Sequence, residues 1–203
     1  MSKKPLIVFE GIEGSGKSHH INQIANYLKK EKKSFIQIRE PGGSKNSEKI
    51  RKLILDNKST FNRNTDLLLY LAARSENIDL IKKNYGKKII LIDRFTDSTL
   101  AYQHYGMGVD IKFIKNINDF LLKDINIDFT FLNLVSPKNM KKRLLIRKKL
   151  NRYDQFSSSF YKKVQDAFVK ILKKNPKKYM KIDSNLSIIN NKNKILNKID
   201  KLI

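Results

Sequence analysis

The sequence predicts an α/β fold: one parallel five-stranded sheet with helices on both of its faces. Short β-branched apolar runs alternate with longer amphipathic stretches along the 203 residues. The apolar runs show little polar alternation, which is typical of strands buried on both faces. A chain of this length with 40% hydrophobic residues can bury a sizeable core. Because no Gly/Ser/Pro-rich linker divides it, we expect a single domain over residues 1–203.

Five apolar runs are predicted as the strands of this sheet. Each is short, rich in β-branched or aromatic residues, and followed by a polar stretch. The five are Leu6–Phe9, Phe35–Arg39, Lys88–Asp93, Phe129–Leu134 and Tyr179–Asp183. Since helical stretches separate them, neighbouring strands are expected to be parallel.

Apolar residues at helical spacing predict the covering helices. Three one-sided stripes are Ile21/Ile24/Ala25/Leu28, Phe113/Ile114/Ile117/Phe120/Leu121 and Phe160/Val164/Ala167/Phe168/Ile171/Leu172. The third is expected to end at Asn175-Pro176, since proline disfavours helix in the residue before it. Residues 190–201, with Ile195, Leu196 and Ile199, predict a surface helix.

The composition limits the chemistry and the partners. There are 43 Lys+Arg against 19 Asp+Glu, a net charge of +24. This excess favours a phosphate-bearing partner, or simply solvated lysines on helix faces. The lysines are spread along the chain without interleaved aromatics, so no nucleic-acid partner is expected. The absence of cysteine excludes disulfides, thiolate catalysis and Cys-ligated metals, and favours a reducing cytoplasm. No apolar run approaches the roughly 20 residues of a membrane span, so a cytoplasmic protein is expected.

A glycine-rich loop follows the first predicted strand and precedes the first predicted helix. It fits G-x-x-x-x-G-K-[ST], the phosphate-binding P-loop pattern. Its residues are Gly11, Ile12, Glu13, Gly14, Ser15, Gly16, Lys17 and Ser18. Backbone N–H groups of such a loop surround phosphates, the Lys reaches the β- and γ-phosphates, and the Ser hydroxyl reaches Mg²⁺. We therefore expect a nucleoside triphosphate to bind here.

Asp93 ends the apolar run Ile89-Ile90-Leu91-Ile92. A carboxylate at the end of a buried strand is how a Walker-B-type Asp directs Mg²⁺, so Ser18 and Asp93 are the predicted metal residues. The alternative is an Asp that caps the following helix. The phosphate loop alone does not name a reaction, and a nucleotide sensor without turnover remains open.

The segment after this strand carries a family signature. Residues 93–103, D-R-F-T-D-S-T-L-A-Y-Q, resemble the D-R-[FYH]-x-x-S-x-x-A-Y-Q motif of thymidylate kinases, which phosphorylate dTMP to dTDP with ATP. Further segments resemble family motifs in the same order over nearly the whole chain. They are Phe9-Glu10-Gly11, Arg39–Ser44, Glu48–Leu53, Leu71–Arg74, Arg152-Tyr153-Asp154 and Ile182-Asp183-Ser184. A kinase for another nucleoside monophosphate is the nearest alternative.

The resemblance implies a role for individual residues of the dTMP site. Glu13 faces the sugar 3′-hydroxyl, Arg51 and Arg94 hold the 5′-phosphate, and Tyr70 stacks on thymine. Arg74 bonds the O4 edge of the base, Thr99 also contacts the base, and Tyr102 packs beneath the deoxyribose. Pro41, Ser98 and Gln103 complete the expected substrate-binding set. The alternative for Tyr70 taken alone is a buried core aromatic.

The resemblance also implies a mobile lid near residues 140–155 and a homodimer formed through helices that flank the sheet. The P-loop has no Arg at its variable positions, so a lid Arg is expected over the transferred phosphoryl group. Arg147 matches that position best, with Lys17 and Arg94 as the other catalytic residues. Arg143 and Arg147, four residues apart, are expected on one helix face, and Arg152 matches the Arg of a D-R pair. A solvated basic helix is the alternative for each.

The chain departs from the family pattern at the lid and at the stacking position. The expected D-R-[FI]-E reads Asn151-Arg152-Tyr153-Asp154, and Lys148 replaces a glycine. G-R-G after the A-Y-Q motif reads Gly106-Met107-Gly108, and Tyr70 replaces the more usual Phe. Tyr70 keeps the aromatic ring and adds a hydroxyl, which needs a polar partner when buried.

Overall fold

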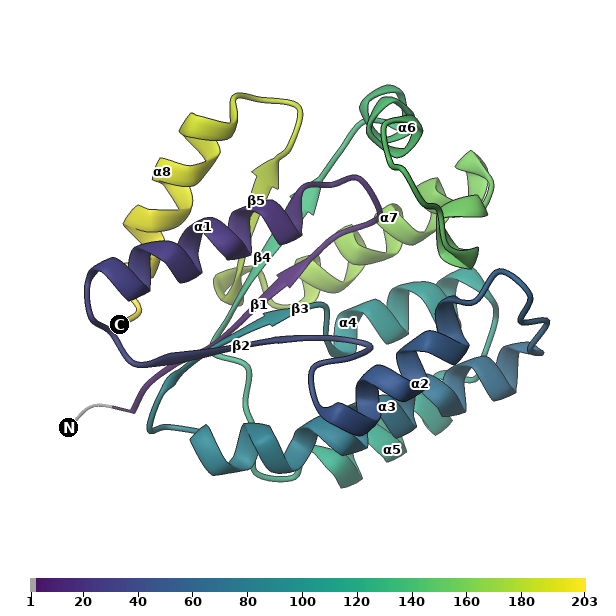
Figure 1. Cartoon of the computed structure of the whole chain (residues 1–203), viewed down its shortest axis with the longest axis horizontal. Helices are drawn as coiled ribbons and strands as arrows, with labels where there is room; N and C mark the ends of the chain where they lie inside the picture. Colours follow the sequence, from purple (N-terminus) through teal and green to yellow (C-terminus); the bar gives the residue numbers. More distant parts are fainter. Residues whose placement is uncertain (1–2) are drawn as a thin grey trace.

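The computed structural model of the chain describes residues 3–203 and contains one parallel sheet (Figure 1). Within those residues the strands are β1 (Leu6–Glu10), β2 (Phe35–Arg39), β3 (Ile89–Asp93), β4 (Phe129–Leu134) and β5 (Tyr179–Asp183). Their order is β2-β3-β1-β4-β5, and every neighbouring pair is parallel. The predicted strands are confirmed to within one residue at each end. Residues 1–2 of the predicted domain lie outside the described residues.

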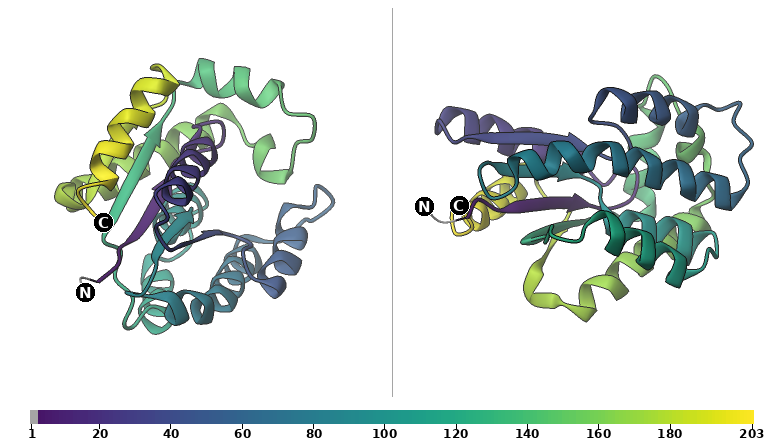
Figure 2. Two further views of the ribbon diagram at one scale, coloured as in Figure 1. Left: turned by 60° about the vertical axis from the view of Figure 1, so that its left-hand side comes forward. Right: turned by 90° about the horizontal axis from the view of Figure 1, so that it is seen from below.

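Helices cover both faces of the sheet, as predicted (Figures 1 and 2). The α-helices are α1 (Lys17–Lys30), α2 (Lys45–Leu55), α3 (Arg63–Asn84), α4 (Thr96–Thr99), α5 (Ile111–Leu121), α6 (Pro137–Leu145), α7 (Ser158–Lys174) and α8 (Ile188–Ile199). Three tighter or wider helices complete the set: a π-helix η1 (Leu100–Gly106) and the 3₁₀ turns η2 (Arg152–Gln155) and η3 (Pro176–Lys178).

Alternate residues of β1 divide the core between the two faces, as the period of a strand requires. Ile7 and Phe9 pack with the apolar faces of α1 and α8. Leu6 and Val8 pack with Ile78 of α3 and other residues on the opposite face. The carboxyl end of β1 is thereby fixed from both sides, and it is here that the phosphate loop begins.

Burial differs from the sequence expectation at the edges of the molecule. The edge strands β2 and β5 are only partly buried, whereas β1 is buried throughout. On α5, Ile114 is buried, but Phe113 is 43% exposed and Phe120 79% exposed. The apolar stripe of α5 is therefore wider than the face of this helix that packs against the rest of the molecule. Conversely, Ile195 and Ile199 of the predicted surface helix are fully buried against the α1 side of the sheet.

The lid region is a helix followed by an irregular turn. The helix α6 ends at Leu145 because the Arg147 N–H donates to the Leu144 carbonyl at 3.0 Å, which tightens the last turn and stops the i→i−4 pattern. The prediction that Arg143 and Arg147 share one helix face is therefore wrong. In residues 3–203, no helix has both the length and the apolar character needed to span a membrane.

Candidate active site

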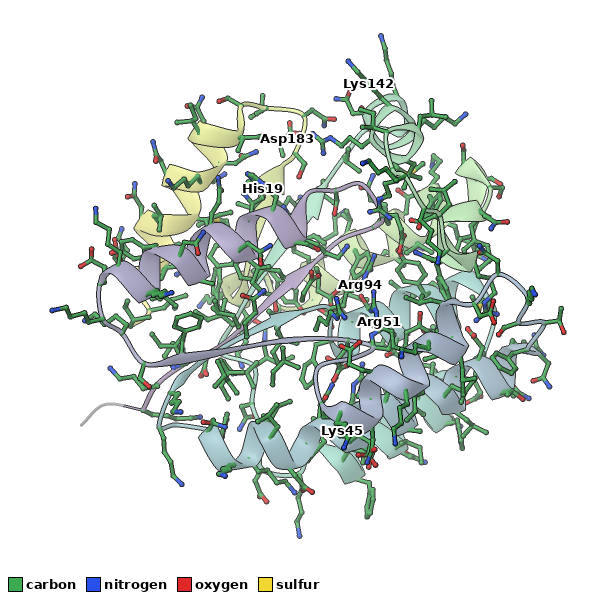
Figure 3. All side chains as sticks on the ribbon, in the orientation of Figure 1. His19, Lys45, Arg51, Arg94, Lys142 and Asp183 are labelled. Atoms are coloured by element: carbon green, nitrogen blue, oxygen red, sulfur yellow. The ribbon has the colours of Figure 1, made fainter. Side chains whose placement is uncertain are left out.

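A cavity of about 280 Å³ opens at the carboxyl ends of the strands, where open α/β sheets place their ligands. Its wall includes every predicted catalytic, metal and substrate residue. These are Glu13, Lys17, Ser18, Pro41, Arg51, Tyr70, Arg74, Asp93, Arg94, Ser98, Thr99, Tyr102, Gln103 and Arg147. Residues from the segment 13–103 and from the lid are thus brought to one hollow. Arg51 and Arg94, which both line this cavity, lie close to each other in the view of Figure 3.

The phosphate loop requires glycine where it leaves β1. Gly11 has a φ of +142°, and a Cβ at this position would lie 2.4 Å from the Asn133 carbonyl oxygen. The loop therefore passes too close to β4 for any side chain at residue 11. It ends where α1 begins, so the first N–H groups of α1 point at the cavity side of the loop.

Lys17 lies at the first position of α1 and is 7% exposed. Its Nζ donates to the Ile12 carbonyl at 3.3 Å. Burial, reinforced by the nearby Arg94 charge, lowers the pKa of Lys17 to about 8. An anion in the loop opposes this shift, because it favours the charged ammonium.

Ser18 and Asp93 meet across the loop. The Ser18 hydroxyl donates to Asp93 Oδ2 at 2.5 Å, and Asp93 Oδ1 is buried without a hydrogen-bond partner among residues 3–203. A hydroxyl and a carboxylate with a spare oxygen are the hard donors that Mg²⁺ takes, so the pair fits this ion. Asp93 does not cap the following helix, because Glu10 accepts the N–H groups there.

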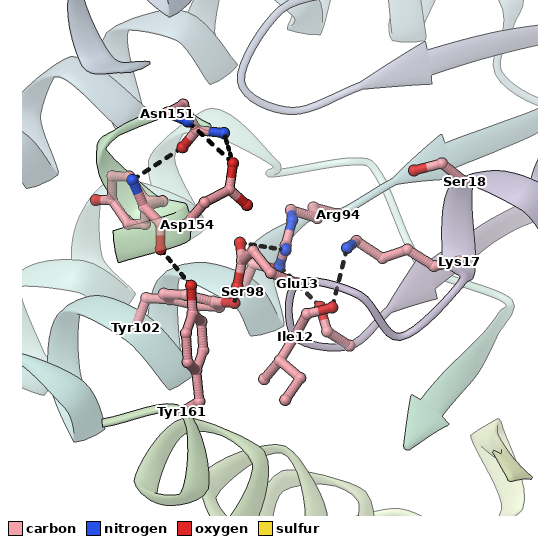
Figure 4. Close-up of polar contacts among 12 residues, drawn as sticks. Ile12, Glu13, Lys17, Ser18, Arg94, Ser98, Tyr102, Asn151, Asp154 and Tyr161 are labelled. Carbon is pink, nitrogen blue, oxygen red and sulfur yellow. Dashed lines mark hydrogen bonds and ion pairs between the residues drawn. The ribbon is translucent and has the colours of Figure 1, made fainter. Parts of the chain in front are cut away.

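Arg94 joins the end of β3 to the phosphate loop (Figure 4). Its guanidinium donates to Glu13 Oε1 at 2.7 Å and to the Gly11 carbonyl at 2.8 Å. Tyr102 donates its hydroxyl to the other oxygen of Glu13. Burial alone would lower the pKa of Arg94, but the facing Glu13 carboxylate and other nearby groups raise it well above its ordinary value. Arg94 therefore stays a cation inside the cavity.

Glu10 supports the site from behind the cavity wall; the sequence analysis quoted it in the segment Phe9-Glu10-Gly11 but assigned it no role. Its carboxylate, 1% exposed, accepts the Phe95 and Ser98 N–H groups at 2.8 and 3.1 Å and the Ser98 hydroxyl at 2.6 Å. It thus caps α4 from a neighbouring strand and fixes the turn that carries Arg94. Burial, followed by repulsion from Asp97, raises the pKa of Glu10 to about 8. The available signal was a charged residue ending an otherwise apolar strand.

Arg74 is the centre of a buried network on the opposite wall. It is 2% exposed and donates to Glu40 at 2.8 Å, Asn118 at 2.7 Å and Thr99 at 2.9 Å. The sequence analysis assigned no role to Glu40, which lies in the Arg39–Ser44 segment, or to Asn118, because their contacts with Arg74 form only when separate elements pack. Their contacts fix the guanidinium at the cavity wall, and Tyr70 lines the same cavity.

The three lid arginines lie in different surroundings. Arg147 lines the cavity and forms an ion pair with Asp154, which is fully buried. Arg143 donates to the Gly14 carbonyl at 2.8 Å and to the Ser184 carbonyl at 2.5 Å, next to the phosphate loop. Arg152 lies outside the cavity wall and pairs with Asp66. Of the three, Arg147 alone belongs to the cavity wall.

Comparison with known proteins agrees with this geometry. The family model described as thymidylate kinase matches residues 9–195. A thymidylate kinase of Thermosipho africanus is 37% identical over 83% of this chain and 84% of its own length. One of Acholeplasma laidlawii is 37% identical over 90% of this chain and 92% of its own. The crystal structure of thymidylate kinase from Ehrlichia chaffeensis superposes with a TM-score of 0.78 at 31% identity, covering 98% of this chain and 99% of that one. The chain belongs to the thymidylate kinase family.

Proposed function

We propose that the cavity at the carboxyl ends of the strands is where this nucleoside monophosphate kinase transfers the γ-phosphoryl group of ATP to dTMP, giving dTDP and ADP. The donor phosphates lie in the loop of residues 11–18, against the N-terminus of α1. Lys17 and the loop N–H groups bind their oxygens. The lowered pKa of Lys17 supports this role, since burial and the Arg94 charge outweigh the nearby carboxylates and a bound phosphate would restore the charged form.

Ser18 and Asp93 would hold Mg²⁺ in the same half of the site. The spare buried oxygen of Asp93 supports this assignment. The ion, when bound, neutralises charge on the donor phosphates.

The acceptor half is the wall opposite the loop. Arg94 and Arg51 bind the 5′-phosphate of dTMP, and Glu13 accepts the 3′-hydroxyl. The base lies against the ring of Tyr70, while Arg74 and Thr99 read its edge and Tyr102 supports the sugar. Pro41, Ser98 and Gln103 complete this wall.

Catalysis consists of positioning and charge neutralisation, with no protein nucleophile. The acceptor phosphate attacks the γ-phosphorus while Lys17, Arg94 and Arg147 stabilise the charge on the transferred group. We place Arg147 on a lid over residues 140–155 of a single domain. The observation that carries the proposal is that Arg94 contacts Glu13 of the donor loop while lining the acceptor wall.

The test is ADP formation from ATP and Mg²⁺ with dTMP, dUMP, dCMP, dGMP or AMP as acceptor. The proposal predicts turnover that depends on dTMP and is fastest with it. Faster turnover with another monophosphate would reassign the acceptor, and ATP binding without any acceptor-dependent ADP would indicate a sensor. A salt titration with DNA is the check on nucleic-acid binding, which the proposal expects to be absent.

We also propose that the chain acts as a homodimer in the cytoplasm. The exposed Phe113 and Phe120 on α5 support a contact face on this helix. Light scattering coupled to size exclusion should give twice the chain mass, and Phe120→Glu should give the monomer. Phe120 is 79% exposed in the single chain, so its replacement should not disturb the fold.

A further inference from the structure

The second half of the lid contacts the acceptor side of the molecule. Residues 150–155 lie along residues 54–66, which comprise the end of α2, the connection to α3 and the first turn of α3, and the two segments approach each other in both Figure 1 and Figure 2 (left). Asn57 Nδ2 donates to the Leu150 carbonyl at 3.0 Å, and Gln155 Nε2 donates to Asn57 Oδ1 at 2.9 Å. Arg152 Nε donates to the Ile54 carbonyl at 3.1 Å. These contacts join two segments almost a hundred residues apart in the chain.

Asp66 is the charged centre of this contact. It lies in the first turn of α3, and 1% of its surface is exposed. One carboxylate oxygen accepts from the Arg152 guanidinium, and the other accepts the Tyr153 hydroxyl. A carboxylate buried this deeply requires such partners, because it has lost its hydration. Both partners come from the lid.

The Tyr153 side chain is held in the cavity wall as a result. Its ring, 4% exposed, meets Tyr70 edge-on, with centroids 5.6 Å apart and planes at 78°. Its hydroxyl also accepts from Gln103 Nε2 at 3.2 Å. A phenylalanine or isoleucine, which the family pattern places here, offers no hydroxyl for Asp66 or Gln103. The Tyr161 hydroxyl of α7 separately donates to the Tyr153 backbone carbonyl. Asp66 therefore orients the Arg152 and Tyr153 side chains, while the backbone here has its own support.

We propose that Asp66 is a positioning residue, which orients Tyr153 against Tyr70 and so fixes the wall of the acceptor pocket. Asp66 does not touch the acceptor; it acts through Tyr153. The inference rests on the proposed acceptor role of this cavity only for its effect on dTMP. The contact of Asp66 with the lid stands on the structure alone, so the two parts are tested separately.

The first experiment measures the contact without using the reaction. Asp66→Asn removes the charge that holds Arg152, whose side chain is 19% exposed. Trypsin cleavage after Arg152, followed by mass spectrometry, should then be at least about fivefold faster than in the parent chain. Asp79→Asn is the matched control, since Asp79 is exposed on the same helix. Equal cleavage in both variants would overturn the inference.

The second experiment measures the consequence for the acceptor. Asp66→Asn should raise the KM for dTMP at least about fivefold and leave the KM for ATP within about twofold, because only the acceptor wall is altered. Tyr153→Phe keeps the ring and should raise the dTMP KM less. The double variant should be no worse than Asp66→Asn, since both changes break one connection. A positioning role would be contradicted if the two substitutions multiplied their effects on the dTMP KM in the double variant. It would also be contradicted if Asp66→Asn changed the KM for dTMP and the KM for ATP equally.

If Asp66→Asn does not fold, Tyr153→Phe carries the test, because it preserves the packing of the ring. It must then raise the dTMP KM and not the ATP KM, and an unchanged dTMP KM overturns the inference. Faster cleavage after Arg152 in a protein that does not use dTMP would leave the contact standing and reject the proposed acceptor.

Discussion

The Arg94 guanidinium lies 2.7 Å from the Glu13 carboxylate, so the residue after β3 and the variable position of the phosphate loop form one ion pair. Both partners are mostly buried, at 16% and 10% side-chain exposure. Any change at one of them therefore leaves the other charge poorly compensated. This pair links the two substrate halves of the proposed site.

Arg94→Ala should raise the KM for dTMP and lower kcat together, because the lost charge serves the phosphate that reacts. A charged hydrogen bond is worth roughly 1.5–3 kcal/mol, so each parameter should change about tenfold or more. Steady-state kinetics with varied dTMP provide the measurement. Exposed Arg63, at the start of α3, offers the control Arg63→Ala, which should behave as the parent chain does. An Arg94→Ala variant with parental kcat contradicts the assignment.

Lys17→Ala should abolish turnover with little loss of stability. The Lys17 Nζ makes one long hydrogen bond, to the Ile12 carbonyl, and its proposed role is to bind phosphate. The measurement is kcat beside a thermal melt. Lys30→Ala, in the exposed last turn of α1, is the control for losing a lysine from the same helix. Parental kcat at matched thermal stability would reject Lys17 as a catalytic residue.

Arg74→Ala should weaken dTMP far more than ATP, and it should also destabilise the fold. The structure adds this second expectation, because Glu40 would be left buried without its ion pair. Breaking such a pair costs about 3–5 kcal/mol. Arg74→Ala combined with Glu40→Gln should recover part of that stability in chemical denaturation, yet keep the high dTMP KM. An unchanged KM in the double variant argues against a base-reading role.

Arg147→Ala should lower kcat far more than it weakens dTMP binding, since an arginine at a phosphoryl transition state can be worth about 10³-fold. A solvated arginine contributes almost nothing to the rate, so the kcat of this variant distinguishes a catalytic Arg147 from a solvated one. Arg147 is 42% exposed and pairs with the buried Asp154, hence a melt must accompany the kinetics. A kcat within about threefold of the parent value corresponds to a change in activation free energy of less than ~1 kcal/mol. Such a result would mean that another residue stabilises the transferred group. Arg143→Ala is the next variant to measure.

Glu10 should make stability fall as the pH rises from about 5 to 8. Its pKa is about 8 in the folded chain and near 4.5 as an ordinary carboxyl. Between these values the folded chain keeps a proton that the unfolded chain has released, so each rise in pH favours unfolding. The Glu10→Gln side chain cannot ionise, so this variant should lack this part of the pH dependence of stability. Urea unfolding of both chains at several pH values is the measurement, and parallel pH curves contradict the assignment.

The sequence alone predicted the elements whose signals are local. Apolar runs predicted all five strands, and the spacing of Gly11 and Lys17 predicted the loop because one short segment contains its whole geometry. Glu40 and Asn118 were assigned no role because their partner, Arg74, is remote in sequence. Such pairings arise only when separate elements pack.

The lid region also shows a feature that the sequence pattern did not predict correctly. Four-residue spacing predicted a shared helix face for Arg143 and Arg147, but the bond to Leu144 ends the helix between them. Phe120 was similarly misjudged, since periodicity identifies an apolar stripe without stating how much of it a neighbour covers. Helix ends and solvent boundaries are decided by small differences in free energy, which a pattern of residue types does not contain.

The central place of β1 in the sheet has a consequence for folding kinetics. Phe9 pairs with Asp93, and Val8 pairs with Thr130 on the other side, so the loop rests on strands more than 80 residues away along the chain. Parallel pairings between such distant segments form slowly, because each requires the closure of a long loop of chain first. No early helical intermediate can hold Lys17, Asp93 and Arg94 together. Recovery of activity on refolding therefore reports completion of the sheet, at a later time than the recovery of helical signal.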